Sequence, residues 1–232
     1  MKVVILAGGK GKRLRPYTYV LPKPLLPLGK KPILDIIFEK LKKQEIKDVY
    51  LAVNYKENIF KVLYGDGSEI GLNINYLKES KPLGTAGPLK SLDGKVTEPF
   101  FVTNGDIISD INVKELRKFY EKTKADITVV TRKIEVPINF GVLEIKKDKI
   151  IKWVEKPKIK LEIAAGMYML SPSVLKYIKK DEFYNMNDLV KKVIRRKGKV
   201  SRFLYDKQPL FDISAIEDYK IAMKSFKKNY KK

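Results

Sequence analysis

Short apolar runs recur along the first half of the chain, separated by segments in which apolar and polar residues alternate with a helical period. Residues 3–6 are wholly apolar and stop at a glycine pair, which is typical of a buried strand. Four more runs are predicted to be strands, at 49–53, 74–77, 100–102 and 127–131. Apolar residues spaced near 3.6 predict the helices between them, one starting at Lys31-Pro32 and others over 57–64, 84–92 and 113–123. Strands and helices alternating about every 25 residues predict a mostly parallel sheet covered by helices on both faces.

The second half of the chain follows a different pattern. Residues 140–145 and 150–154 lie close together around Lys147-Asp148-Lys149, which predicts a β-hairpin inserted in the α/β frame. A strand over 164–170, a helix over 171–178, a basic helix over 188–195, an edge strand over 200–205 and a last helix over 216–230 complete the prediction. The fold class expected is therefore α/β, a Rossmann-like mixed, mostly parallel sheet with an inserted hairpin. Neither a repeat nor a linker is visible, so residues 1–232 are expected to form a single domain.

The amino-acid composition limits the kinds of catalytic and metal site that the protein can have. The 232 residues include no cysteine and no histidine, which excludes disulfides, cysteine-ligated metals and hydrolases with a histidine base. Apolar runs are too short to cross a membrane, and the first of them leads directly into a charged glycine loop rather than a signal-peptide cleavage site. We therefore expect a cytoplasmic protein without a membrane partner.

The chain is strongly basic, with 49 Lys and Arg against 27 Asp and Glu and a formal charge of +22. Such an excess is compatible with nucleic acid, an acidic membrane surface or polyphosphate ligands. Most lysines are spread over the polar faces of predicted helices, where they are simply solvated, and the composition is also compatible with a thermophilic host. Because no basic motif is interleaved with aromatic residues, nucleic acid is disfavoured as a partner.

The loop after the first strand suits an anion. Gly8, Gly9 and Gly11 allow the backbone to turn sharply and approach a ligand, and Arg13 and a proline-braced Lys23 follow closely. The glycine spacing matches neither the phosphate-loop motif nor the dinucleotide-binding motif. The spacing alone is therefore equally compatible with a tight turn that binds no ligand.

Polar residues follow three of the other apolar runs, where an open parallel sheet binds its ligands. Asp106 ends the sequence TNGD, and Asp212 follows Leu210-Phe211. Carboxylates at strand ends are suitable ligands for Mg²⁺. An NGD sequence by itself, however, often forms only a turn. Glu79 opens ESKPLGTAGPL, and its acceptor-only carboxylate would complement the N1-H and N2-H donors of guanine. A solvated glutamate is the plain alternative there, and Trp153 is expected to pack in the core.

LAGGKGKRLRPYT and PKPLLPLGKKP together resemble the opening signature of sugar-1-phosphate nucleotidylyltransferases. The resemblance implies the nucleotide-diphospho-sugar transferase fold and transfer of a nucleotidyl group from a nucleoside triphosphate to a sugar 1-phosphate. It implies catalytic roles for Arg13, Lys23 and Asp106, and Mg²⁺ as cofactor held by Asp106 and Asp212. Nucleotide binding is implied for Leu6, Ala7, Gly8, Gly9, Gly11, Lys12, Glu79, Gly84 and Thr85. Sugar-phosphate binding is implied for Gly141, Glu155, Lys156 and Gly166.

Within that family the sequence favours GTP and mannose 1-phosphate, because residues 79–89 are similar to those of mannose-1-phosphate guanylyltransferases. UTP or dTTP with glucose 1-phosphate or an amino-sugar 1-phosphate is the alternative. The chain departs from the family pattern at two places. It has Ala164-Ala165-Gly166 where many relatives have Asn-Ala-Gly, and Asp212-Ile213-Ser214-Ala215 where they have Asp-Ile-Gly-Thr. A non-catalytic paralogue is therefore a further alternative. A homo-oligomer is left open, and the C-terminal β-helix of many relatives is expected to be absent.

Overall fold

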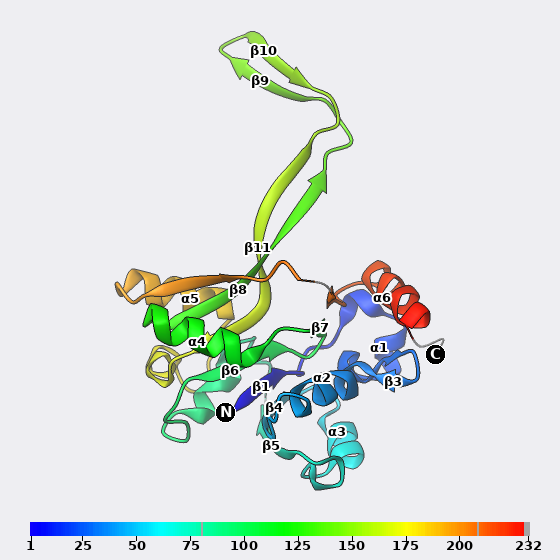
Figure 1. The fold of residues 1–232 in the computed structure, drawn as a ribbon, viewed down its shortest axis with the longest axis vertical. Coiled ribbons are helices and arrows are strands. Elements are labelled where there is room, and N and C mark those ends of the chain that lie inside the picture. Colours follow the sequence, from blue (N-terminus) through cyan, green and yellow to red (C-terminus); the bar gives the residue numbers. More distant parts are fainter. Residues whose placement is uncertain (80, 208, 230–232) are drawn as a thin grey trace.

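A seven-stranded sheet forms the centre of the computed structural model, which describes residues 1–79, 81–207 and 209–229 (Figure 1). Its strand order is β12-β8-β11-β6-β1-β4-β5. Only β11 runs antiparallel to its neighbours, while every other pairing in this sheet is parallel. The strands are β1 (Val3–Leu6), β4 (Asp48–Val53), β5 (Asn73–Lys78), β6 (Phe100–Asn104), β8 (Ile127–Pro137), β11 (Lys158–Leu170) and β12 (Val200–Leu204). The predicted fold class and the edge position of β12 are confirmed.

Two apolar cores lie on the two faces of this sheet. Val3 and Ile5 of β1 belong to one core and Val4 to the other, as the alternation of side chains along a strand requires. The first core is covered by α2 (Ile33–Lys42), α3 (Glu57–Tyr64), α4 (Val113–Thr123) and α6 (Ile216–Asn229). The second is covered by α5 (Met186–Arg195) and the 3₁₀ helices η4 (Gly87–Leu92) and η5 (Pro172–Tyr177). Since both faces are buried, the central strands read as continuous apolar runs.

The predicted helices are confirmed with two corrections. Residues 84–92 and 171–178 form only the 3₁₀ helices η4 and η5. Each has a proline in its first turn, and because proline has no backbone N–H it cannot donate a hydrogen bond within the helix. In α6, Phe226 is buried, and residue 230, where the predicted helix ends, lies outside the described residues. Across the described residues, no helix is long and apolar enough to cross a membrane.

Short elements complete the described chain. The 3₁₀ helices η1 (Lys12–Leu14), η2 (Lys23–Leu25) and η3 (Ser68–Ile70) and the one-turn helix α1 (Tyr17–Val20) lie in the first third. Two-stranded pairings join β2 (Pro27–Leu28) to β3 (Lys31–Pro32) and β7 (Ile107–Ser109) to β13 (Leu210–Asp212). The β7–β13 pairing is functionally important because it brings the C-terminal part of the chain beside the end of β6.

A long arm projects from the sheet (Figure 1). The strands β8 and β11 are longer than the predicted 127–131 and 164–170, and their antiparallel pairing continues outward as far as Pro137 opposite Lys158. The predicted hairpin forms the outer part of this arm as β9 (Val142–Lys146) and β10 (Lys149–Val154). The hairpin is therefore confirmed, but it stands away from the frame instead of packing on it.

The hairpin has one apolar face. Leu143 is paired with Trp153 and Ile145 with Ile150, so these four side chains lie on the same side of the two strands. Trp153 is 62% exposed, and the expectation that it packs in the core is wrong. The physical reason is that no second layer covers this face among the described residues, so a pattern typical of half-buried strands does not produce burial here.

The N-terminus of α4 provides a stability prediction. The Asn112 side chain accepts a hydrogen bond from the Glu115 backbone N–H at 3.0 Å. Replacing Asn112 by Ala removes this cap and should lower the free energy of unfolding by about 1 kcal/mol, measured by urea denaturation. Asn112→Asp, which retains an acceptor, is the matched control and should change stability by less than half as much; equal losses in both variants would contradict the capping role.

Candidate functional site

A cavity of about 450 Å³ lies at the carboxyl ends of β1, β4, β5 and β6. This is where an open parallel sheet is expected to bind ligands. All nine residues predicted to bind the nucleotide line it: Leu6, Ala7, Gly8, Gly9, Gly11, Lys12, Glu79, Gly84 and Thr85. Lys23 and Asp106 line it too. Residues that lie up to a hundred positions apart in the sequence are thus gathered around one space.

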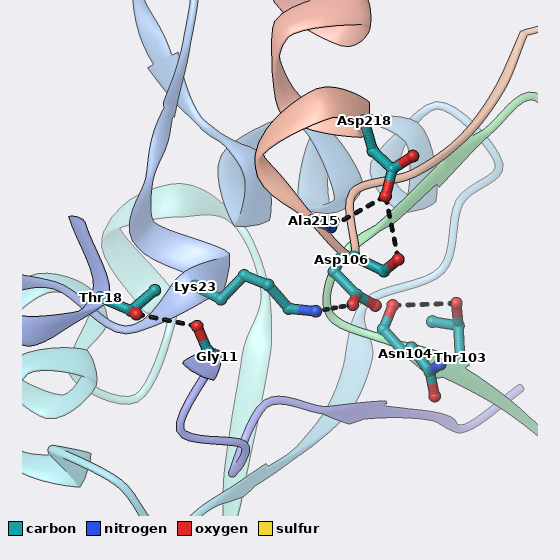
Figure 2. Close-up of polar contacts among 9 residues, drawn as sticks. Gly11, Thr18, Lys23, Thr103, Asn104, Asp106, Ala215 and Asp218 are labelled. Atoms are coloured by element: carbon teal, nitrogen blue, oxygen red, sulfur yellow. Dashed lines mark hydrogen bonds and ion pairs between the residues drawn. The ribbon is translucent and has the colours of Figure 1, made fainter. Parts of the chain in front are cut away.

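The glycine loop is held in a fixed shape. Gly11 has a φ of +57°, and a Cβ atom placed on it would lie only 2.8 Å from Cγ2 of Thr18. The Thr18 hydroxyl donates a hydrogen bond to the Gly11 carbonyl at 2.8 Å (Figure 2). Any larger residue at position 11 would therefore disturb both the backbone conformation and the contact with α1.

Lys23 and Asp106 form an ion pair at the edge of the cavity (Figure 2). Lys23 begins η2 between Pro22 and Pro24, which fix the backbone on either side of it. The two side chains are 17% and 11% exposed, so the pair is largely removed from water. Lys23 contacts only one carboxylate oxygen, and Asp106 Oδ1 is buried without a hydrogen-bond partner among the described residues. A buried acceptor of this kind is available to a ligand or a metal ion.

Asp212 lies beside Asp106. In the β7–β13 pairing Asp212 is opposite Ile107, and the Ile213 N–H donates to the Asp106 carbonyl at 3.0 Å. Burial raises the pKa of Asp212 above its ordinary value, the Asp106 charge raises this pKa further, and Lys23 and Arg132 oppose the shift. The two carboxylates singled out in the sequence are therefore close enough to influence one another.

The carboxylate pair fits Mg²⁺ better than a metal that needs a complete protein cage. Within the described part of the chain, no three His, Cys, Asp or Glu side chains are grouped as a metal centre. Mg²⁺ commonly takes one or two carboxylates and completes its shell with phosphate oxygens and water. Asp106, with its unpartnered Oδ1, and the neighbouring Asp212 provide such a partial shell.

Glu79 is part of the cavity wall. It is only 8% exposed, and its Oε2 accepts a hydrogen bond from the Leu83 N–H at 2.9 Å. A Cβ on Gly8 would lie 2.9 Å from Glu79 Oε1, so this second oxygen lies against the glycine loop. Burial raises the pKa of Glu79, and the bond from Leu83 opposes that shift. The alternative of a solvated surface glutamate is excluded.

Besides Asp212, five predicted site residues do not line the cavity. The Arg13 side chain, on η1, is exposed, and Gly141, Glu155 and Lys156 belong to the projecting arm. Gly166 lies closer, since a Cβ on it would be 2.8 Å from Nδ2 of Asn104, which itself lines the cavity. The functional roles of these residues remain predictions.

The cavity also contains residues that sequence reasoning missed. Asn54 and Asn104 lie at the ends of β4 and β6, and the Asn54 amide donates to the Glu79 carbonyl at 3.0 Å. Their strand-end positions are a signal that could have identified them. Phe183 also lines the cavity although it comes from the segment before α5, and nothing in its sequence context indicates this.

Comparisons with known proteins agree with this geometry. Residues 2–228 match the protein family described as nucleotidyl transferase. The chain is 44% identical over 186 residues to a mannose-1-phosphate guanyltransferase of Yarrowia lipolytica and 42% identical over 187 residues to one of Aspergillus fumigatus. Each alignment covers 77% of this chain but 51% of the relative, so the chain spans about half the length of these curated relatives.

A solved structure extends the likeness over nearly the whole fold. HddC from Yersinia pseudotuberculosis, complexed with GMP-PN, superposes with a TM-score of 0.74 over 97% of this chain and 99% of that chain, at 26% identity. The resemblance to sugar-1-phosphate nucleotidylyltransferases that the opening loop suggested is thereby confirmed at the level of the family. This chain belongs to the nucleotidyl transferase family.

Proposed function

We propose that the chain transfers a guanylyl group from GTP to mannose 1-phosphate and releases pyrophosphate. The observation that carries the proposal is the single cavity in which the glycine loop, the Lys23–Asp106 pair and Glu79 meet. A nucleoside triphosphate needs a base-binding end and a phosphate-binding end, and these residues supply one of each. The choice of GTP and mannose is supported by relatives that carry the name mannose-1-phosphate guanyltransferase.

At the base end, Glu79 supplies the selectivity that we propose. An ionised carboxylate offers acceptors only, and guanine offers two adjacent N–H donors on its edge. The other bases do not present this pair of donors. Because Glu79 is buried in the cavity wall, a base without these donors would leave the carboxylate poorly paired, which disfavours the wrong nucleotide.

At the phosphate end, Lys23 neutralises charge on the α-phosphate while an oxygen of the sugar phosphate attacks in line. Its ion pair with Asp106 and the flanking prolines hold the ammonium group in place before substrate arrives. The nucleophile is already an anion, so the reaction requires no protein base, in keeping with a chain that has no histidine. Positioning and charge neutralisation provide most of the rate enhancement.

Asp106 and Asp212 would hold Mg²⁺, which when bound neutralises phosphate charge and orients the reacting groups. Sugar-phosphate binding by Gly141, Glu155, Lys156 and Gly166, a contribution of Arg13 to phosphate binding, and a cytoplasmic location are predictions carried forward from the sequence. The altered residues Ala164 and Ser214-Ala215 bear mainly on which sugar is accepted.

The first test is turnover. The protein is incubated with each of GTP, UTP, dTTP, ATP and CTP and a panel of sugar 1-phosphates with Mg²⁺, and released pyrophosphate is measured. GTP with mannose 1-phosphate should give the highest rate, and a chelator should abolish it. Activity restricted to UTP or dTTP with glucose 1-phosphate would select the alternative substrates. No release from any combination would support the non-catalytic paralogue.

The metal assignment is tested by Asp106→Asn, which keeps the size of the side chain but removes its charge. Turnover should fall by at least about 100-fold, because charge stabilisation in the transition state is lost. Circular dichroism and the thermal midpoint establish that the variant is folded. Asp110→Asn, at an exposed carboxylate paired with Lys40, is the matched control and should retain the parental rate. An unchanged rate in Asp106→Asn would show that the assignment is wrong.

Base selection is tested separately with Glu79→Gln. The amide keeps an acceptor for the Leu83 N–H but replaces an acceptor with a donor, so the ratio of kcat/KM for GTP to that for dTTP should fall roughly 10-fold. Glu69→Gln on η3, where the side chain is exposed, should leave the ratio unchanged. If the ratio is also unchanged in Glu79→Gln, Glu79 does not select the base.

A further inference from the structure

One part of the cavity proposed for the nucleotide comes from the second half of the chain. Phe183 lies between η5 and α5, and it lines this cavity together with Glu79 and the glycine loop. It is the only aromatic residue among the described residues that line the cavity. Because Phe183 is 62% exposed, other protein groups leave most of its surface uncovered. An apolar, aromatic surface is therefore available to a ligand at this place.

Backbone hydrogen bonds fix the position of Phe183. The peptide unit that joins Phe183 to Tyr184 donates its N–H to the Leu83 carbonyl at 2.8 Å. The Tyr184 carbonyl in turn accepts a hydrogen bond from the Ala86 N–H at 2.8 Å. The segment that carries Phe183 is thus paired with the loop before η4. Its backbone is anchored to the cavity wall, so the aromatic ring does not stand on an unattached loop.

The two segments also approach each other closely. A Cβ atom placed on Gly84 would lie 2.5 Å from the Tyr184 carbonyl oxygen. A Cβ atom placed on Gly87 would lie 3.0 Å from the Glu182 carbonyl oxygen. The residues on both sides of Phe183 therefore contact glycines of the loop, where a larger residue would push the segments apart.

Phe183 lies at the end of the cavity that contains Glu79. The Leu83 N–H donates to Glu79 Oε2 at 2.9 Å, and the carbonyl of the same residue accepts the hydrogen bond from Tyr184. Leu83 therefore connects the carboxylate proposed to select the base with the segment that carries Phe183. The ion pair proposed for the phosphate end comes from η2 and the turn after β6 instead. The aromatic ring is consequently placed with the base and not with the phosphates.

We propose that Phe183 stacks on the base of the bound nucleotide and shields one of its faces from water. The inference rests on the proposed function and adds a binding residue to it. A base whose edge is hydrogen-bonded to Glu79 still has two flat faces, and an aromatic ring is suited to cover one of them. Stacking between aromatic side chains and bases tolerates any base. Phe183 thus contributes affinity, whereas Glu79 contributes selectivity.

Two simpler explanations compete with stacking. Single exposed apolar residues are common on protein surfaces, and in that case replacing Phe183 would change nothing. Alternatively, Phe183 could serve only to hold its segment against the loop before η4. Its loss would then lower the thermal midpoint and weaken every ligand of the cavity alike. Stacking predicts instead a loss that is confined to ligands with a base.

The test compares Phe183→Ala, Phe183→Leu and Phe183→Tyr with the parent protein and with Phe140→Ala, a matched control at an exposed phenylalanine of the arm. Calorimetry with Mg²⁺ and without sugar phosphate measures binding of GTP, dTTP and ribose 5-triphosphate, which lacks a base. Phe183→Ala should weaken GTP binding about 10- to 100-fold, Phe183→Leu less, and Phe183→Tyr less than about 2-fold. Ribose 5-triphosphate binding and the ratio of GTP to dTTP affinity should stay within about 3-fold in all variants. Phe140→Ala should bind GTP as the parent does.

A fluorescence measurement reports the contact directly. Trp153, on the arm, is the only tryptophan of the chain, so Phe183→Trp combined with Trp153→Phe carries a single reporter at the proposed site. GTP should quench its fluorescence because the base stacks on the indole ring, and ribose 5-triphosphate should not. Quenching of equal size by both ligands would contradict stacking.

The outcomes separate this inference from the proposed function. Binding is measured without turnover, so a protein that binds GTP through Phe183 but releases no pyrophosphate would overturn the activity and leave the inference supported. Equal weakening of GTP and ribose 5-triphosphate in Phe183→Ala, or GTP binding within about 2-fold of the parent, would overturn the inference. A parent protein that binds no nucleoside triphosphate would overturn it as well. If Phe183→Ala fails to fold, Phe183→Leu and the tryptophan reporter decide by the same comparison.

Discussion

The ion pair between Lys23 and Asp106 is the interaction on which the site depends. It connects the N-terminal loop to the turn after β6, and it forms because β1 lies next to β6 in the sheet. Leu6 is opposite Asn104 in that parallel pairing, and the Gly105 N–H donates to the Leu6 carbonyl at 2.9 Å. The loop and the turn therefore leave the sheet side by side. Burial makes the pair costly to separate, since either charge alone would be poorly solvated.

This constraint also determines the electrostatics of the site. The chain as a whole carries a formal charge of +22, yet the surroundings of Asp212 combine two cations, Lys23 and Arg132, with the carboxylates of Asp106 and Asp218. The Asp218 carboxylate is already engaged, because it accepts hydrogen bonds from the Ser214 hydroxyl at 2.9 Å and the Ala215 N–H at 2.8 Å. Among the described residues, Asp106 Oδ1 and Arg132 Nε have no hydrogen-bond partner.

Sequence patterns predicted the parts of the fold that are specified locally. The bounds of α3 and α4 match the predicted 57–64 and 113–123, because apolar periodicity and the Asn112 cap both act within a few residues. The arm was predicted poorly. Whether a hairpin with an apolar face packs on the body depends on the lengths of β8 and β11, which result from pairing across twenty or more intervening residues. For this reason Trp153, in a pattern typical of half-buried strands, is largely exposed.

In the site, as in the fold, some features can be predicted from nearby residues, whereas others depend on pairing between distant strands. The strand-end rule for parallel sheets pointed to Glu79 and Asp106, both of which line the cavity. The residues of the glycine loop, together with Gly84 and Thr85, were instead implied by the resemblance to the family. Arg132 lies inside a strand and is one of 49 basic residues in the chain, so no local pattern distinguishes it. Its placement depends on β8 pairing with β11 in one register and on β13 pairing with β7 in another. A shift of one residue in β8 would turn Arg132 to the opposite face of the sheet and bring Lys133 to this one. The charge available beside Asp212 is therefore specified by strand register rather than by any motif.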